Sequence, residues 1–152
     1  MNDARMRLEE QLRQKTLEKG QNGETLVRFA FDAMRRAYAP YSHFTVGAAL
    51  LGKNGKIYLG CNVENAAYSP TCCAERNAVF SAVADGCKKF DAIAVVGGQD
   101  GNVTDFCPPC GVCRQVLSEF CGPEFTVILA KSFSERKIFR LKELLPESFK
   151  LN

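Results

Sequence analysis

Residues 44–61 read FTVGAALLGKNGKIYLGC. Two runs rich in β-branched and apolar residues, Phe44 to Leu51 and Lys56 to Cys61, lie on either side of Asn54-Gly55. Asn-Gly between two such runs is the strongest short-range signal for a β-hairpin. The stretch therefore predicts two antiparallel strands that begin a sheet.

Helical and strand patterns alternate on both sides of this hairpin. Before it, a helix is predicted from about Thr25 to Ala37, because apolar residues recur on one face and Pro40 stops the pattern. After it, the predicted elements are a helix Ala74–Ala84, a strand Ala92–Val96, a helix Gly111–Phe120, a strand Phe125–Ala130, a short strand Ile138–Leu141 and a helical turn Leu141–Leu145. This order predicts an α/β fold, with a mixed central β-sheet sandwiched by helices.

Composition and charge indicate one soluble domain. The chain has 152 residues, 46% of them apolar, and a net charge of +3, which is close to the average for globular proteins. No apolar run approaches the roughly 20 residues that span a bilayer. Nucleic-acid binding usually shows a clustered basic face, so we expect neither a nucleic-acid nor a membrane partner.

The N-terminal stretch differs from the rest of the chain. Met1 to Gly20 alternates basic and acidic residues and lacks the apolar region of a secretory signal, so a cytoplasmic location is expected. Glycines at 20 and 23 are expected to break any helix formed there. Residues 1–22 are therefore predicted to be a charged extension, helical or disordered, and residues 23–152 a single folded domain.

Eight cysteines in a chain of this kind favour metal binding over disulfides. Cys73 stands at the start of one predicted helix, and Cys110 and Cys113 start another. A helix N-terminus stabilises a thiolate, the form that binds zinc, and Cys-x-x-Cys spacing lets two sulfurs reach one ion. Three protein ligands leave the fourth position to water, as in catalytic zinc sites, whereas a fourth ligand from His43 or another cysteine would close the site.

Glu75 follows the first cysteine by two positions, which places a carboxylate near the metal without making it a ligand. Zinc lowers the pKa of a bound water to about 7, and a neighbouring carboxylate can accept the proton and pass it to a substrate. Arg76 can donate hydrogen bonds to a ligand sulfur and offset the net charge of −1 on zinc with three thiolates. The residues alone thus predict zinc-dependent hydrolysis of a small molecule, with Glu75 as the catalytic acid–base.

These motifs resemble the zinc deaminases, whose signature is a His-x-Glu or Cys-x-Glu helix start followed by Pro-Cys-x-x-Cys. Residues 73–76, CAER, and 109–115, PCGVCRQ, closely resemble the free-nucleoside cytidine deaminases of the homotetrameric, three-cysteine type. The similarity extends through residues 40–50, PYSHFTVGAAL, and 60–68, GCNVENAAY. It covers about Glu24 to Phe149 and leaves out the N-terminal extension.

The resemblance implies a three-layer α/β/α fold, one zinc ion per subunit, and a homotetramer with shared active sites. It implies hydrolytic deamination of cytidine and deoxycytidine to uridine and deoxyuridine, with release of ammonia, as in pyrimidine salvage. It also implies substrate-binding roles for six residues: the ribose-binding pair Asn62 and Glu64, the aromatic Phe44 against the base, the backbone of Ala74, and Tyr68 and Phe149, which would complete a neighbour's active site.

Three other functions are compatible with parts of the sequence. A deaminase of another cytosine nucleoside, such as a nucleoside antibiotic, would share the Cys-x-Glu site. A polynucleotide editor usually has His as its first ligand and needs a basic channel. A structural-zinc or redox module would need a fourth ligand and no carboxylate. The remaining cysteines are interpreted as bystanders, and Cys107 also as an alternative that competes for the metal: Cys61, Cys72, Cys87, Cys107 and Cys121.

Overall fold

The computed structural model describes residues 21–151. The predicted charged extension therefore lies almost wholly outside the described residues. The elements are α2 (Gln21–Met34), β1 (Phe44–Gly52), β2 (Ile57–Cys61), α3 (Ala74–Ala84), β3 (Phe90–Gln99), α4 (Gly111–Phe120), β4 (Thr126–Ala130), β5 (Arg136–Arg140) and α5 (Leu141–Leu144). Their order is the predicted one. No helix in the described range is long and apolar enough to cross a membrane.

The five strands form one mixed sheet in the order β2-β1-β3-β4-β5. β3 and β4 are parallel, and all the other neighbours are antiparallel. The parallel pair is joined by α4, because parallel strands need a crossover connection. This arrangement confirms the predicted mixed central sheet.

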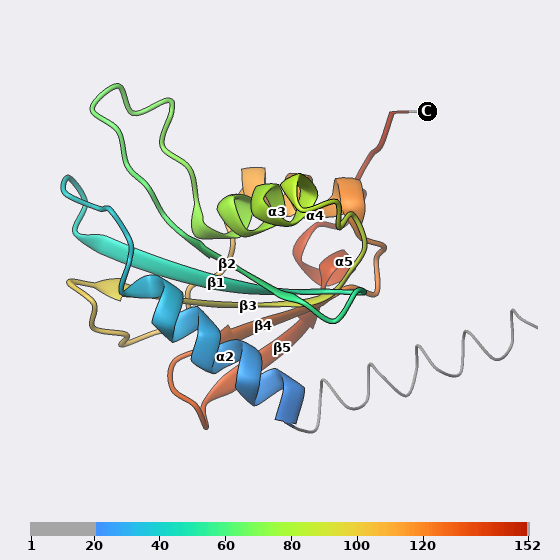
Figure 1. The fold of residues 1–152 in the computed structure, drawn as a ribbon, viewed down its shortest axis with the longest axis horizontal. Helices are drawn as coiled ribbons and strands as arrows, with labels where there is room; N and C mark the ends of the chain where they lie inside the picture. The colour runs from blue at the N-terminus through green and yellow to red at the C-terminus, as the bar shows by residue number, and fades with distance from the viewer. Residues whose placement is uncertain (1–20, 152) are drawn as a thin grey trace, which may run out of the picture.

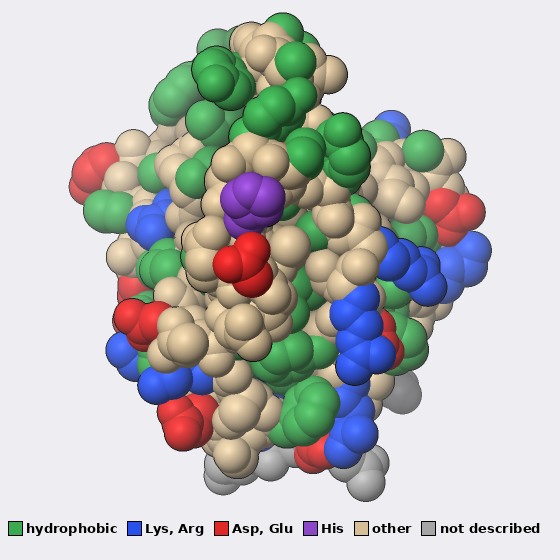
Figure 2. Space-filling model, turned by 90° about the vertical axis from the view of Figure 1, so that its left-hand side faces the viewer, with side chains coloured by type: hydrophobic (Ala, Val, Ile, Leu, Met, Phe, Trp, Pro, Cys, Tyr) green, Lys and Arg blue, Asp and Glu red, His purple; other side chains and the backbone are tan. Residues whose placement is uncertain are grey.

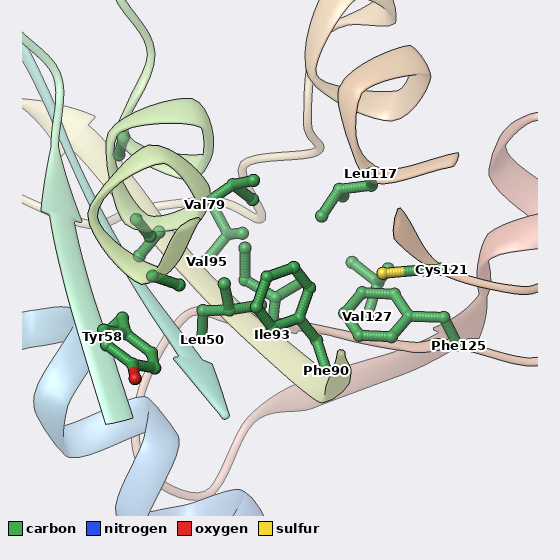
Figure 3. Close-up of a cluster of buried hydrophobic side chains, with 14 of the residues drawn as sticks. Leu50, Tyr58, Val79, Phe90, Ile93, Val95, Leu117, Cys121, Phe125 and Val127 are labelled. Carbon is green, nitrogen blue, oxygen red and sulfur yellow. The ribbon is translucent and has the colours of Figure 1, made fainter. Parts of the chain in front are cut away.

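Helices cover both faces of the sheet (Figure 1). α2 packs on one face over a buried cluster that includes Leu26, Val27 and Ile128. α3 and α4 lie on the other face over a second cluster, whose larger members include Leu50, Ile93 and Leu117 (Figure 3). The result is a three-layer α/β/α fold, in which both helices that start with cysteines lie on the same face.

The hairpin forms where predicted, between β1 and β2. Gly55 adopts φ +85°, and Gly52 both donates to the carbonyl of Lys56 at 2.9 Å and accepts from the amide of Gly55 at 3.0 Å. This is a loop of residues 53–55 that ends in a left-handed glycine, rather than a two-residue turn. The glycine of Asn54-Gly55 therefore supplies the required left-handed conformation.

Two elements differ from their predicted bounds by three residues or more, and the others by at most two, as in β5, which runs from Arg136 to Arg140 and not from Ile138 to Leu141. Within the described residues α2 runs from Gln21 to Met34, through Gly23, although the sequence predicted a helix from Thr25 to Ala37 with a break near Gly23. A single glycine costs a helix only about 1 kcal/mol, and the buried face of α2 offsets that cost. β3 continues through Gly97 and Gly98, although the sequence predicted that these glycines end it.

Gly60 lets α3 lie directly on the sheet. A Cβ added to Gly60 would lie 2.0 Å from the carbonyl oxygen of Ala74 and 2.5 Å from the amide nitrogen of Ala78. Both atoms are backbone, so neither can move without shifting the helix. The Asn77 side-chain amide also donates to the carbonyl of Cys61 at 2.8 Å. The first turn of α3, which carries Glu75, is thus held against β2.

We expect Gly60→Ala to lower the free energy of unfolding by about 2 kcal/mol or more, because overpacking against backbone forces a shift of α3. For a domain of this size that is a fall in Tm of roughly 4–8 °C, measurable by thermal denaturation. Gly122→Ala is the matched control, since nothing lies within 4 Å of an added Cβ there. Equal melting temperatures for the two variants would contradict the close packing.

Candidate active site

Three cysteine sulfurs meet where α3 and α4 begin. The Sγ atoms of Cys73, Cys110 and Cys113 all lie within 4.8 Å of one another, and Cys73 and Cys110 are 3.7 Å apart. Cys73 is the residue before the first turn of α3, and Cys110 is the N-cap of α4, where its sulfur accepts the Cys113 amide at 3.4 Å. The structure thus brings together the three predicted metal ligands.

The start of α4 is fixed by its neighbours. The Arg114 side chain donates to the carbonyl of Pro109 at 2.7 Å and to that of Leu144, also at 2.7 Å. The first hydrogen bond ties α4 to the preceding proline segment, and the second ties it to α5. The Cys-x-x-Cys turn is therefore held in place from both sides.

The chemistry of the three sulfurs suits a zinc ion. Hydrogen bonds from Cys113 and Arg76 lower the pKa of Cys73 to about 5, whereas the hydrogen bond with Cys73 and burial raise the pKa of Cys113. Thiolates this close repel one another, which opposes ionisation of Cys113 beside Cys73. A divalent cation held by these sulfurs would offset that repulsion and favour the thiolate form of its ligands. In the described chain no histidine, acid or other cysteine joins this group, so three protein ligands are available.

Glu75 lies beside the sulfurs and is almost completely shielded from solvent. Its side chain is buried, with 3% of the residue exposed, and its Oε2 is 3.8 Å from the Sγ of Cys113. Burial raises the pKa of this carboxyl to about 7. A carboxyl with that pKa exchanges a proton readily near neutral pH.

Arg76 contacts the cluster from the same helix turn. Its Nη2 donates to the Sγ of Cys73 at 3.2 Å, and that bond raises the pKa of the guanidinium further. A permanent positive charge here favours the thiolate form of Cys73. Among the described residues, the buried Nε of Arg76 has no hydrogen-bond partner.

Of the two residues expected to bind ribose, Asn62 contacts the start of β1 and Glu64 contacts the turn before it. The Asn62 side chain accepts the Val46 amide and donates to the Phe44 carbonyl, both at 2.8 Å. Glu64 is 9% exposed, and its carboxylate accepts the Tyr41 amide at 2.9 Å and the Ser42 amide at 3.2 Å. The hydrogen bond from the Ser42 hydroxyl lowers the pKa of Glu64. Ser42 was not among the predicted site residues.

Phe44 and Cys107 lie together over Gly97. A Cβ on Gly97 would lie 3.1 Å from the Phe44 ring and 2.8 Å from the Sγ of Cys107. The glycine therefore allows both side chains to approach β3. Burial raises the pKa of Cys107 to about 12, which keeps this thiol neutral and apolar. From sequence spacing, Cys107 was expected only as a bystander or a competing ligand.

The remaining residues expected to bind substrate are Ala74, Tyr68 and Phe149. Ala74 is the fully buried first residue of α3. Tyr68 is exposed and has φ 58°, and its ring meets that of Tyr41 edge-on, with centroids 6.3 Å apart. Phe149 is exposed, and its carbonyl accepts from Gln115 at 3.4 Å. The roles of Tyr68 and Phe149 in a neighbouring subunit stay a prediction.

All eight cysteines are free thiols, in line with the expectation against disulfides.

Figure 2 looks onto the end of the molecule where the loops after α2, β2 and β3 gather. Hydrophobic side chains cluster at the top of this view, and the single histidine lies below them. Exposed hydrophobic residues of these loops include Tyr41, Val63 and Tyr68.

Comparison with known proteins agrees with this site. The family model of the cytidine and deoxycytidylate deaminase zinc-binding region matches residues 21–129. A cytidine deaminase of Sporosarcina psychrophila is 48% identical over 126 residues, which are 83% of this chain and 90% of that protein. One from Halalkalibacterium halodurans is 44% identical over 83% of this chain and 92% of its own length.

Solved structures agree as well. The crystal structure of cytidine deaminase from Burkholderia pseudomallei has a TM-score of 0.75 and 45% identity, covering 82% of this chain and 97% of that one. The structure from Mycobacterium tuberculosis has the same TM-score and 39% identity, covering 87% and 100%. The predicted fold class and zinc-binding region are therefore confirmed, and the chain belongs to the cytidine and deoxycytidylate deaminase family.

Proposed function

We propose that this protein is an enzyme that hydrolyses cytidine and deoxycytidine to uridine and deoxyuridine, with release of ammonia. The observation that carries the proposal is the buried carboxyl of Glu75 beside three clustered cysteine sulfurs. A closed structural metal site has a fourth ligand and no need of such a carboxyl. The names of the similar proteins give the same reaction.

In the proposed mechanism Cys73, Cys110 and Cys113 hold the zinc ion, which when bound lowers the pKa of water towards about 7. Glu75 takes a proton from the attacking water and delivers it to N3 of the pyrimidine. The water oxygen bonds to C4, and the bond from C4 to the amino nitrogen breaks. Glu75 then passes the second proton of the water to the leaving amine, so that the products are the uracil nucleoside and ammonia.

Both proton transfers suit the position of Glu75. A carboxyl with a pKa of about 7 is both a competent base and a competent acid near neutral pH. Its burial excludes bulk water, which would otherwise compete for the proton. Arg76 would offset the charge of the three thiolates and orient Cys73.

Nucleoside binding is assigned to the residues around the start of β1. Phe44 would pack against the base and the Ala74 backbone would help to recognise it, while Asn62 and Glu64 would hold the ribose hydroxyls. An amide and a carboxylate together satisfy both the donor and the acceptor side of a hydroxyl. The position of Asn62 and Glu64 against the backbone of residues 41–46 supports this assignment.

We further propose a cytoplasmic homotetramer that acts in pyrimidine salvage, in which Tyr68 and Phe149 complete a neighbour's active site. The exposure of both aromatic side chains supports such a role. Nucleosides are the proposed partners, and nucleic acids are not. A modified cytosine nucleoside is the alternative substrate, and the similar proteins do not favour it.

The test is to incubate the purified protein with cytidine and to follow uridine and ammonia. Turnover is expected, and it should disappear on chelation and return with added zinc. Deoxycytidine should also react. A folded, zinc-loaded protein without turnover of either nucleoside would contradict the proposed reaction.

A further inference from the structure

The Ser42 hydroxyl links two of the proposed substrate-binding residues. It donates to Oε1 of Glu64, and it accepts the backbone amide of Phe44 at 3.0 Å. A hydroxyl can do both at once, because it has one donor and two acceptor lone pairs. The group proposed to hold ribose and the residue proposed to pack against the base therefore share one partner.

The backbone of Phe44 is held at both ends. Its amide donates to the Ser42 hydroxyl, and its carbonyl accepts from the Asn62 side chain at 2.8 Å. The Glu64 carboxylate in turn accepts hydrogen bonds from the backbone amides of Tyr41 and Ser42. One connected network thus sets how the segment 41–44 lies against the two polar residues that follow β2.

The opposite side of this segment is anchored to the end of β3. Gln99 donates to the carbonyl of Ser42 at 3.0 Å, and the Asp100 amide donates to the carbonyl of His43 at 2.7 Å. His43 and Asp100 both have left-handed backbones, with φ 57° and 51°. Non-glycine residues adopt this conformation infrequently, although Asp and His do so more readily than most. These two hydrogen bonds from the end of β3 therefore hold the backbone of the turn before Phe44 in one conformation.

We propose that Ser42 is a positioning residue that fixes Glu64 and Phe44 for nucleoside binding. The inference rests on the proposed function. In the described chain the hydrogen bonds of Ser42 go to Glu64, Phe44 and Gln99, and none goes to the cysteines or to Glu75. Ser42 therefore affects substrate binding and has no part in the proton transfers made by Glu75.

Removing the hydroxyl leaves the Phe44 amide without this partner, and it leaves Oε1 of Glu64 with only the Ser42 amide, at 3.3 Å. Glu64 and Phe44 are then held less firmly, by the backbone amides of residues 41 and 42 and by Asn62, which weakens binding of the nucleoside in the ground state and in the transition state equally. A change of this kind raises KM and leaves kcat unchanged. Of the two hydrogen bonds that the hydroxyl makes, the one to the Glu64 carboxylate is the stronger, so the effect depends on Glu64.

The test is steady-state kinetics with cytidine for Ser42→Ala, Ser42→Thr and Thr45→Val. We expect Ser42→Ala to raise KM about 10-fold, with kcat and zinc content close to wild type, and Ser42→Thr to restore KM. Thr45→Val is the matched control, because that hydroxyl lies three residues further on, in β1, and within the described chain it donates to the Gly98 carbonyl at 3.3 Å and to no substrate-binding residue. It should behave as wild type.

A double-mutant cycle with Glu64→Gln separates positioning from general loosening. If Ser42 acts through Glu64, adding Ser42→Ala to Glu64→Gln should raise KM by much less than 10-fold. An unchanged KM in Ser42→Ala, an equal effect in both backgrounds, or a joint loss of kcat and zinc would overturn the inference. A wild-type protein without cytidine turnover would overturn the proposed function and this inference with it.

Discussion

A Glu75→Gln variant is expected to keep its zinc and to lose nearly all turnover of cytidine. The amide has the shape of the carboxyl but can neither accept a proton from water nor return it to the substrate. General acid–base catalysis is worth roughly 10²–10⁴-fold, and this one residue is proposed to make two transfers. We therefore expect kcat to fall by at least about 10³-fold, measured by uridine formation, with zinc determined by metal analysis.

The retained zinc is what distinguishes this result from unfolding. Glu75 is buried 3.8 Å from the Cys113 sulfur and lies outside the group of three sulfurs, so its replacement removes no ligand. Glu119→Gln, which changes an exposed acid on α4, is the control and should keep full activity. A Glu75→Gln protein that had lost its zinc would show that Glu75 is a structural residue.

The helices at the site were predictable because residues close to their ends determine where they begin and end. α3 and α4 run from Ala74 to Ala84 and from Gly111 to Phe120, as predicted. Each begins directly after a cysteine and ends close to a glycine, at Gly86 and Gly122. Signals of this kind act within a few residues, so a sequence pattern suffices to find them.

The first helix and the third strand were harder because tertiary packing decides their limits. Gly23 reads as a break, but burying the face of α2 against the sheet outweighs its propensity cost. Gly97 and Gly98 read as a strand end, but here they allow close approach. A Cβ on Gly98 would lie 2.0 Å from the carbonyl oxygen of Asn102, a proximity that no local pattern reveals.

The same division applies to the candidate site. The cysteines and Glu75 follow from spacing at two helix starts, since those positions are fixed locally. The contact between Glu75 and Cys113 joins residues 38 apart, and that between Glu64 and Ser42 joins residues 22 apart. Such contacts depend on how strands and loops are stacked. Ser42 was accordingly missed, because a serine before a strand also suits an ordinary turn.

A Cys110→Ser variant is expected to lose zinc and all activity while α4 keeps its start. Cys110 has two roles. It is a proposed zinc ligand, and it is the N-cap of α4, where its sulfur accepts a hydrogen bond from the Cys113 amide at 3.4 Å. Serine is a preferred N-cap residue, but its neutral hydroxyl is a poor substitute for a thiolate on zinc. Cys110→Ala should lose both contributions and be the less stable of the two, by about 1 kcal/mol.

Thermal denaturation with and without zinc separates these two contributions. A ligand that binds only the folded state at 100 times its Kd stabilises it by about 2.7 kcal/mol, so the Tm of the wild type should fall on chelation. Both Cys110 variants should show a Tm that does not respond to zinc. Cys61→Ala, which changes a thiol outside the sulfur group, should respond as the wild type does. A zinc-loaded, active Cys110→Ala protein would remove Cys110 from the ligands, and the cluster would then need a different third donor.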